Sequence, residues 1–272
     1  MHHLIAATLC PIGARLINGQ GGLFDRGRLI CHVLLIETEE GLVLVDTGLG
    51  TGDIANPKRL GPPFVMFAAP RLDPAETALA QVQALGFKAD DVRHVVMTHL
   101  DLDHAGGLSD FPRAKVHVHA REHEAATART TFQAKGRYIP DQWRHGPNWQ
   151  LHSGGGEHWF GFDGVKALTS RETDVLLIPL FGHTLGHCGV AVRTGDTWLL
   201  HAGDSYFFHG QIEVNGPAMP GGLARFQKLV DTDRPQRIAN QARLHELNAN
   251  HGGAVKIFCA HDPVEHARCI AR

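Results

Sequence analysis

THLDLDHAGG, residues 98–107, brings four potential metal ligands into six consecutive positions: His99, Asp101, Asp103 and His104. The apolar run at 92–98 predicts a strand that ends where these ligands begin. A strand followed by a turn directs alternate side chains toward one point. Asp103 and His104 fall past the turn and can face a second point. Because imidazole and carboxylate groups are common ligands, this spacing indicates a metal site rather than a polar loop.

Three further potential ligands each follow a predicted apolar strand. His183 comes after residues 175–180, Asp204 after 197–200 and His261 after 255–259. Functional residues are disproportionately found on such connecting segments, held in place by a rigid scaffold. We therefore expect these ligands to meet those of the 98–107 stretch at one site.

The motifs HLDLDH (99–104), GHTLGH (182–187), AGD (202–204) and AHD (260–262) together resemble the signature of the metallo-β-lactamase superfamily. The resemblance covers nearly the whole chain. It implies an α/β (α+β) fold, a four-layer αβ/βα sandwich with metal ions at one edge of the sheets. The branch that looks most similar is that of the N-acyl homoserine lactonases, because GHTLGH, a tyrosine close behind AGD, and the terminal AHD all match.

This resemblance implies a role for each potential ligand. His99, Asp101 and His183 would hold a first metal ion, Asp103, His104 and His261 would hold a second, and Asp204 would bridge the two. Two divalent ions are therefore expected. Zinc suits a set of imidazoles and carboxylates, and Mn, Fe or Co are compatible with the same donor types. His187 is expected to orient metal ligands from behind, and Asp46 is expected either to do the same or to form the turn after its strand.

Asp101 departs from the family pattern, which usually has histidine at this position. A third carboxylate makes the site less positive, so the site becomes a weaker Lewis acid and attracts anions less. We expect this change to favour a neutral substrate and a harder metal. The alternative is that the first site becomes weak and only the second ion binds tightly.

The implied chemistry is hydrolysis. A metal-bridging hydroxide would open a lactone or a related carboxylic ester, with Asp103, Asp204 and Tyr206 as the catalytic residues. Asp103 would handle the proton, and Tyr206 would help to hold the substrate carbonyl. The alternatives within hydrolysis are β-lactam opening, thioester cleavage of the glyoxalase II type and phosphotriester cleavage. The alternative from another class is a mononuclear iron thiol dioxygenase, which needs one iron on two histidines and one carboxylate.

The composition limits the other function classes. The net charge of −2 gives no basic excess for nucleic acid. The chain has no run of 18 apolar residues and no signal-peptide pattern at its start, and its five cysteines form no CxxC pair. We expect a cytoplasmic protein with a small-molecule substrate and no membrane or nucleic-acid partner, and a homodimer is the candidate assembly.

The chain is expected to form a single metallo-β-lactamase-like domain over 1–272, with an irregular insertion at about 132–165. A hairpin is predicted at 29–45, a loop rich in proline and glycine at 50–74, and a helix that begins after Asp73 and ends at Gly86. Further helices are expected at 120–130 and 223–247. Aromatic residues could make an apolar pocket mouth: Phe64, Met66, Phe67, Trp143, Trp149, Trp159 and Phe160.

Overall fold

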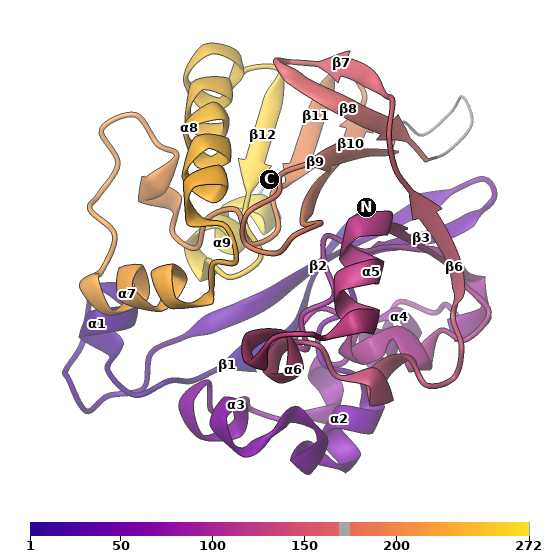
Figure 1. Cartoon of the computed structure of the whole chain (residues 1–272), viewed down its shortest axis with the longest axis horizontal. Coiled ribbons are helices and arrows are strands. Elements are labelled where there is room, and N and C mark those ends of the chain that lie inside the picture. Colours follow the sequence, from indigo (N-terminus) through magenta and orange to yellow (C-terminus); the bar gives the residue numbers. More distant parts are fainter. Residues whose placement is uncertain (169–174, 272) are drawn as a thin grey trace.

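Two six-stranded sheets face each other at the centre of this computed structural model, which describes residues 1–168 and 175–271 (Figure 1). The first sheet has its strands in chain order: β1 (His2–Leu9), β2 (Leu29–Thr38), β3 (Gly41–Val45), β4 (Val92–Val96), β5 (Lys115–His119) and β6 (Asn148–His152). The second sheet runs in reverse order: β12 (Val255–Phe258), β11 (Thr197–His201), β10 (Cys188–Thr194), β9 (Val175–Pro179), β8 (Phe162–Ala167) and β7 (Glu157–Trp159). Each sheet mixes antiparallel and parallel pairs.

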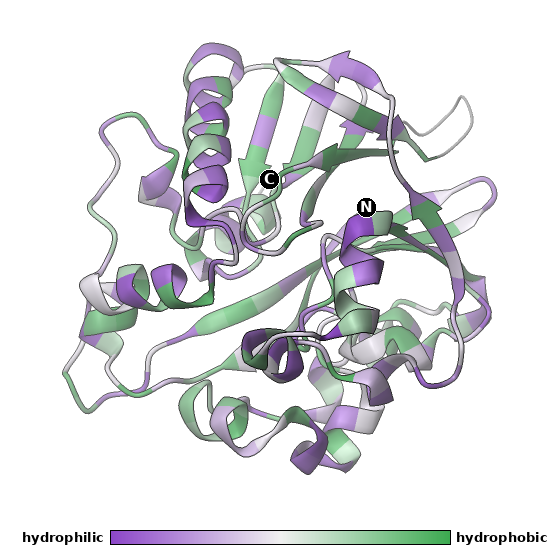
Figure 2. Cartoon of the chain, in the orientation of Figure 1, coloured by the Kyte–Doolittle hydropathy of each residue, from purple (hydrophilic) through white to green (hydrophobic). Residues whose placement is uncertain are grey.

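Apolar side chains on both faces of each sheet create the layers. Between the sheets, Leu34 and Val96 belong to the same buried cluster as Leu177 and Val190. The outer face of the first sheet packs against α4 (Ala78–Ala84) and α5 (Ala120–Ala128), and that of the second sheet against α8 (Arg234–His251). Figure 2 shows strands such as β2 and β9 as mainly hydrophobic, the edge strands β7 and β8 as partly hydrophilic, and α8 with both hydrophilic and hydrophobic residues. The predicted order of helix, sheet, sheet and helix is confirmed.

The prediction of a loop over 50–74 was wrong. This segment contains α2 (Thr51–Ala55), the 3-10 helix η1 (Pro57–Leu60) and α3 (Pro62–Phe67). Pro57 and Pro62 stand at the start of their helices, where proline's missing N–H costs nothing. The predicted helix after Asp73 is also divided. Asp73 caps only the short η2 (Pro74–Glu76), and α4 begins anew with Thr77 as its cap.

Residues 132–165 are more regular than the expected irregular insertion. They contain α6 (Phe132–Arg137), η5 (Pro140–Trp143), β6, β7 and the first part of β8. Strand β6 extends the first sheet in parallel beside β5, and β7 with β8 completes the edge of the second sheet. Most of the glycines that suggested irregularity lie between these elements, where several have positive φ, whereas Gly136 lies within α6 and Gly164 within β8.

The expected helix over 223–247 is two helices, α7 (Gly221–Val230) and α8. Asp233 caps α8 and a proline lies in its first turn, so the second helix starts in a new direction. The other helical segments are α1 (Ala14–Asn18), η3 (Ala89–Asp91), η4 (Gly106–Asp110), η6 (His209–Gln211) and α9 (Pro263–Ile270). Among the described residues, none of these helices combines the length and the apolar character needed to cross a bilayer.

The inter-sheet core gives a direct stability prediction. Leu34 is fully buried between the sheets, so Leu34→Ala leaves a cavity and should lower the free energy of unfolding by about 3 kcal/mol. Chemical denaturation of the metal-free protein measures this change. Leu151→Ala is the control, because Leu151 is 49% exposed on the edge strand β6. Equal losses in the two variants would contradict the assignment of the core.

Candidate metal centre

The stretch THLDLDHAGG forms a tight turn directly after β4. The backbone N–H groups of His104 and Ala105 both donate to the carbonyl of Asp101, at 2.9 and 3.0 Å. The turn packs closely against its neighbours, because a Cβ atom at Gly106 would come within 2.2 Å of the Asp53 carboxylate. Only glycine is compatible with this approach. The turn therefore brings residues 99, 101, 103 and 104 to the edge of the sheets, as the sequence predicted.

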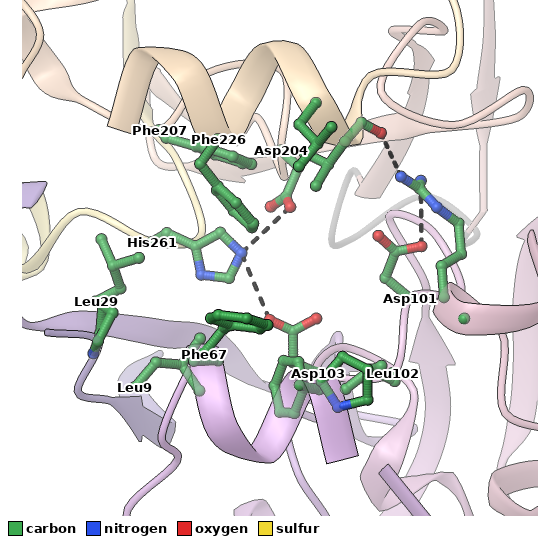
Figure 3. Close-up of a pocket in the computed structure, with 18 of the residues that line it drawn as sticks. Leu9, Leu29, Phe67, Asp101, Leu102, Asp103, Asp204, Phe207, Phe226 and His261 are labelled. Atoms are coloured by element: carbon green, nitrogen blue, oxygen red, sulfur yellow. Dashed lines mark hydrogen bonds and ion pairs between the residues drawn. The ribbon is translucent and has the colours of Figure 1, made fainter. Parts of the chain in front are cut away.

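Four histidines surround the carboxylate of Asp204. The Nε2 atoms of His183 and His261 lie 3.4 and 3.2 Å from Asp204 Oδ2, and that of His99 lies 3.8 Å from it. The Nε2 atom of His104 lies 3.4 Å from the other oxygen, Oδ1. Figure 3 shows His261 between Asp204 and Asp103, with an ion pair to each. Asp204 thus lies at the centre of the cluster.

The Nδ1 atoms of three of these histidines are held from behind. His99 contacts the hydroxyl of Thr98 at 2.9 Å, and His104 contacts Asp46 at 2.9 Å. His261 Nδ1 lies 2.7 Å from the carbonyl oxygen of Ile30, to which it donates. Such contacts fix the ring orientation and tautomer of a metal-binding histidine.

Asp46 and His187 have the supporting positions expected from the sequence. Asp46 accepts hydrogen bonds from both the backbone N–H and the hydroxyl of Thr98, besides its contact with His104. His187 Nε2 accepts the backbone N–H of Asp204 at 2.9 Å, while its Nδ1 contacts the carbonyl of Leu180. Burial, then the neighbouring His99 and His183, hold the pKa of His187 well below its usual range, so it acts as a neutral acceptor.

Among the described residues, three groups have donor atoms close enough together to hold an ion. The groups are His99, Asp101 and His183; His99, His104 and Asp204; and Cys31, Asp103 and His261. All seven predicted ligands occur in these groups. Cys31 is a buried donor on β2 that no motif predicted.

The chemistry of the donor set fits a cation. His99 Nε2 and Asp204 Oδ1 are both buried, and neither has a hydrogen-bond partner among the described residues. A buried polar atom left without a partner is costly, and an exception of this kind requires an explanation. A divalent ion among these atoms would satisfy them.

The carboxylates at the centre are held in their charged form. Burial works to raise the pKa of Asp204, but His261, His104 and His183 outweigh it and hold that pKa well below its usual range. Burial likewise opposes ionisation of Asp101, whereas Arg137 and then His99 keep its pKa well below the usual value. Both side chains are therefore available as anionic ligands at neutral pH.

A pocket with a volume of about 700 Å³ opens onto this centre (Figure 3). Its polar floor consists of Asp101, Asp103, Arg137, His183, Asp204 and His261. The walls are mainly apolar and are lined by Leu9, Pro11, Ile17, Leu29, Pro63, Phe64, Phe67, Ala68, Leu102, Phe132, Phe207, Phe226, Leu229 and Val230, with Gln133, Gly136 and Asp231 as the exceptions.

The aromatic mouth was only partly predicted. Phe64 and Phe67 line the pocket, and Met66 does not. Trp143 and Trp149 pack against the core on the outer face of the first sheet, and Trp159 lies in the core of the second. The rest of the walls come from segments such as β1, β2, α6 and α7, which meet only in the folded chain.

The expectation that Tyr206 contacts substrate does not fit the structure. Its side chain is fully buried and does not line the pocket. Its hydroxyl donates to both oxygens of Glu265, at 2.9 and 3.2 Å. Glu265, on α9, also accepts the backbone N–H of Cys259. Its carboxylate therefore joins the segment after Asp204, through Tyr206, to the segment before His261, and Tyr206 has a structural role.

Glu122 is a buried carboxylate that the sequence analysis missed. It accepts the N–H of Leu100 through Oε1, and the hydroxyl of Thr184 and the N–H of Gly186 through Oε2. It therefore joins the ligand turn after β4 to the loop that carries His183. Gly186 is required here, because a Cβ atom would come within 2.2 Å of the backbone nitrogen of Glu122.

Comparisons with known proteins agree with this geometry. A family model described as the metallo-beta-lactamase superfamily matches residues 26–244. The chain is 41% identical over 263 residues to a probable metallo-hydrolase of Mycobacterium tuberculosis, an alignment that covers 97% of this chain and 80% of that protein. It is 32% identical over 196 residues to an N-acyl homoserine lactonase of Agrobacterium fabrum, covering 71% of this chain and 67% of the relative.

Solved structures match the fold over almost the full length. One is a Bacillus thuringiensis AiiA variant with N-decanoyl-L-homoserine bound at its active site, with a TM-score of 0.71 and 21% identity over 98% of this chain and 95% of that one. Another is a dizinc quorum-quenching lactonase, with a TM-score of 0.59 and 17% identity over 96% and 86% of the two chains. These matches confirm the predicted αβ/βα fold.

Removing the Glu122 carboxylate tests whether it organises the centre. Glu122→Ala leaves the buried N–H groups of Leu100 and Gly186 without acceptors, so the free energy of unfolding should fall by roughly 2–6 kcal/mol. Urea denaturation of the metal-free variant measures the loss. Glu124→Ala is the matched control, because Glu124 is exposed two positions along the same helix. A Glu122→Ala variant as stable as this control would refute the role.

Proposed function

The chain belongs to the metallo-beta-lactamase superfamily and is a metallo-hydrolase, and we propose that it opens the ring of a lactone, or cleaves a related carboxylic ester, that carries an apolar acyl group. The observation that carries this proposal is the position of the Asp204 cluster on the floor of a pocket with apolar walls. The groups that would carry out the reaction and the walls that would select the substrate therefore lie in the same cavity.

The ligand assignment follows the family resemblance, and its first trio is also one of the donor groups: His99, Asp101 and His183 would hold one divalent ion. Asp103, His104 and His261 would hold the other, since His261 Nε2 lies 3.4 Å from His104 Nε2 and 3.8 Å from Asp103 Oδ2. Asp204 would lie between the two ions. Bound there, the two ions would supply a water nucleophile that ionises near neutral pH and would polarise the substrate carbonyl. Zinc is the metal that we expect for this set of imidazoles and carboxylates.

The protein's own side chains position the substrate and move the proton. Asp103 lines the pocket and lies 3.8 Å from His261 Nε2, so its carboxylate is at the boundary between ligands and substrate. In ring opening, an oxygen from water bonds to the carbonyl carbon as the bond from that carbon to the ring oxygen breaks. Asp103 would accept the proton from water and return it to the departing alkoxide, so the product is a hydroxy acid.

The apolar walls favour a substrate with an acyl chain over a substrate with a charged substituent. The stacked rings of Phe207 and Phe226 have centroids 5.9 Å apart on one side of the pocket. Leu9 and Leu29 lie on the opposite side (Figure 3). Ligand sites of this kind bind the apolar part of a ligand by burial and orient it with a few polar groups. The relative from Agrobacterium fabrum is named an N-acyl homoserine lactonase, which supports a substrate with both a lactone ring and an acyl tail.

One observation favours a second candidate function. With Asp101 in place of histidine, the first donor group consists of two histidines and one carboxylate, the set that non-haem iron(II) oxygenases use. A mononuclear iron thiol dioxygenase would use only this group. The remaining donors around Asp204 would then have no ion, and the hydrolase proposal is preferred because it uses all of them.

Metal content and lactone hydrolysis, measured on the same preparation, test the proposal. We expect two divalent ions per chain, ring opening of N-acyl homoserine lactones, and loss of activity on chelation that zinc restores. Asp204→Asn keeps the size but removes the central charge, so metal affinity should fall by at least the roughly 10–100-fold that loss of a supporting partner causes. One iron per chain and no turnover of lactones, β-lactams, thioesters or phosphotriesters would instead favour the dioxygenase.

The apolar walls predict a preference for long acyl chains. Phe226→Ala should raise KM for a decanoyl lactone by roughly 10-fold or more, because burial of a large apolar side chain contributes about 1.5–3 kcal/mol. KM for a butanoyl lactone should change much less. Phe24→Ala is the control, since Phe24 is 93% exposed and lies outside the pocket lining. Equal effects of Phe226→Ala on both substrates would argue against an acyl site at this wall.

A further inference from the structure

The two carboxylate oxygens of Asp101 face different partners. Oδ2 lies 3.1 Å from His183 Nε2 and 3.5 Å from His99 Nε2, within the first donor group. Oδ1 lies 3.3 Å from Arg137 Nη1, and a dashed line at Asp101 marks this ion pair in Figure 3. One oxygen is therefore directed to the candidate metal position and the other to a cation that the protein supplies.

Arg137 is held firmly where it meets Asp101. It ends α6 and is 9% exposed. Its Nη1 donates to the carbonyl of His183 at 3.1 Å, and its Nη2 donates to the carbonyl of Val230 at the end of α7. The guanidinium thus connects α6, α7 and the loop of a proposed metal ligand. A planar group with several fixed donors suits this task, which a lysine ammonium performs less well.

The charge of Arg137 offsets that of Asp101. Where related proteins usually have a neutral histidine, this chain has an anion, which makes the centre less positive. The buried guanidinium at 3.3 Å adds one positive charge beside that anion, where the low local dielectric makes the interaction stronger than in water. In the described part of the chain, Asp101 has this ion pair with Arg137 and otherwise pairs with histidines.

We propose that Arg137 is a positioning residue for the first metal ion. Its charge lies beside Oδ1 and leaves Oδ2 as the oxygen that faces the first donor group, and it returns the positive charge that the aspartate removes. Arg137 and Asp101 therefore form one functional pair that replaces a histidine. This inference rests on the metal site proposed above, but not on the identity of the substrate.

Calorimetric titration of metal-free protein with Zn²⁺ tests the pair. Arg137→Met should lower the affinity for one of the two ions by roughly 10–100-fold, the usual cost of losing a residue that orients a ligand. The affinity for the other ion should not change. Arg137→Lys should recover part of the loss. Asp101→His alone should also lower the affinity for the first ion, because the guanidinium would then lie beside neutral imidazoles and a cation with no carboxylate to offset its charge. The double variant Asp101→His/Arg137→Met should recover near-native affinity.

The double variant separates this role from a merely structural one. If Arg137 served only to tie α6 and α7 together, Arg137→Met would be equally damaging with aspartate or histidine at position 101. Unchanged affinity in Asp101→His, or no recovery in the double variant, would overturn the proposal even if Arg137→Met does not fold. A wild-type protein that binds no Zn²⁺ would instead refute the proposed metal centre itself, and this result requires no substrate to detect.

Discussion

The buried carboxylate of Asp204, with four imidazole Nε2 atoms within 3.8 Å, is the contact on which the arrangement of the site depends. The first sheet supplies two of these rings from the turn after β4, and the second sheet supplies the other two together with Asp204. Three of the rings are oriented by a contact at Nδ1, and that of His261 crosses to the carbonyl of Ile30 in the first sheet. The two sheets must therefore pack in one register for the donors to meet, and the inter-sheet core provides that register.

The ligand set was predictable because it depends on local patterns. Apolar runs identify strands, and functional residues are often found on the segments that follow them. This reasoning made His183, Asp204 and His261 candidates, the spacing within residues 99–104 added the other candidate donors, and the family resemblance assigned their roles. The layer order could be predicted by resemblance, and matches to solved structures bear it out.

The parts that could not be predicted depend on contacts between distant segments. Arg137 is 36 positions from Asp101, and no motif marks it; the charge deficit created by Asp101 was the only available signal. Glu122 resembles any helical glutamate until the fold buries it against two loops. Tyr206 was misplaced because proximity in sequence does not determine which way a side chain points. The prolines of 50–74 suggested a loop, whereas they begin short helices.

Anomalous diffraction from crystals of the protein purified without added metal is the measurement that tests the central claim most directly. The account predicts two peaks, one on each side of the Asp204 carboxylate, with Asp101 bound to one ion through Oδ2 and still paired with Arg137 through Oδ1. Absorption edges would identify zinc or another divalent metal. A single iron at His99, Asp101 and His183, with no ion near His104 and His261, would contradict a dinuclear hydrolase.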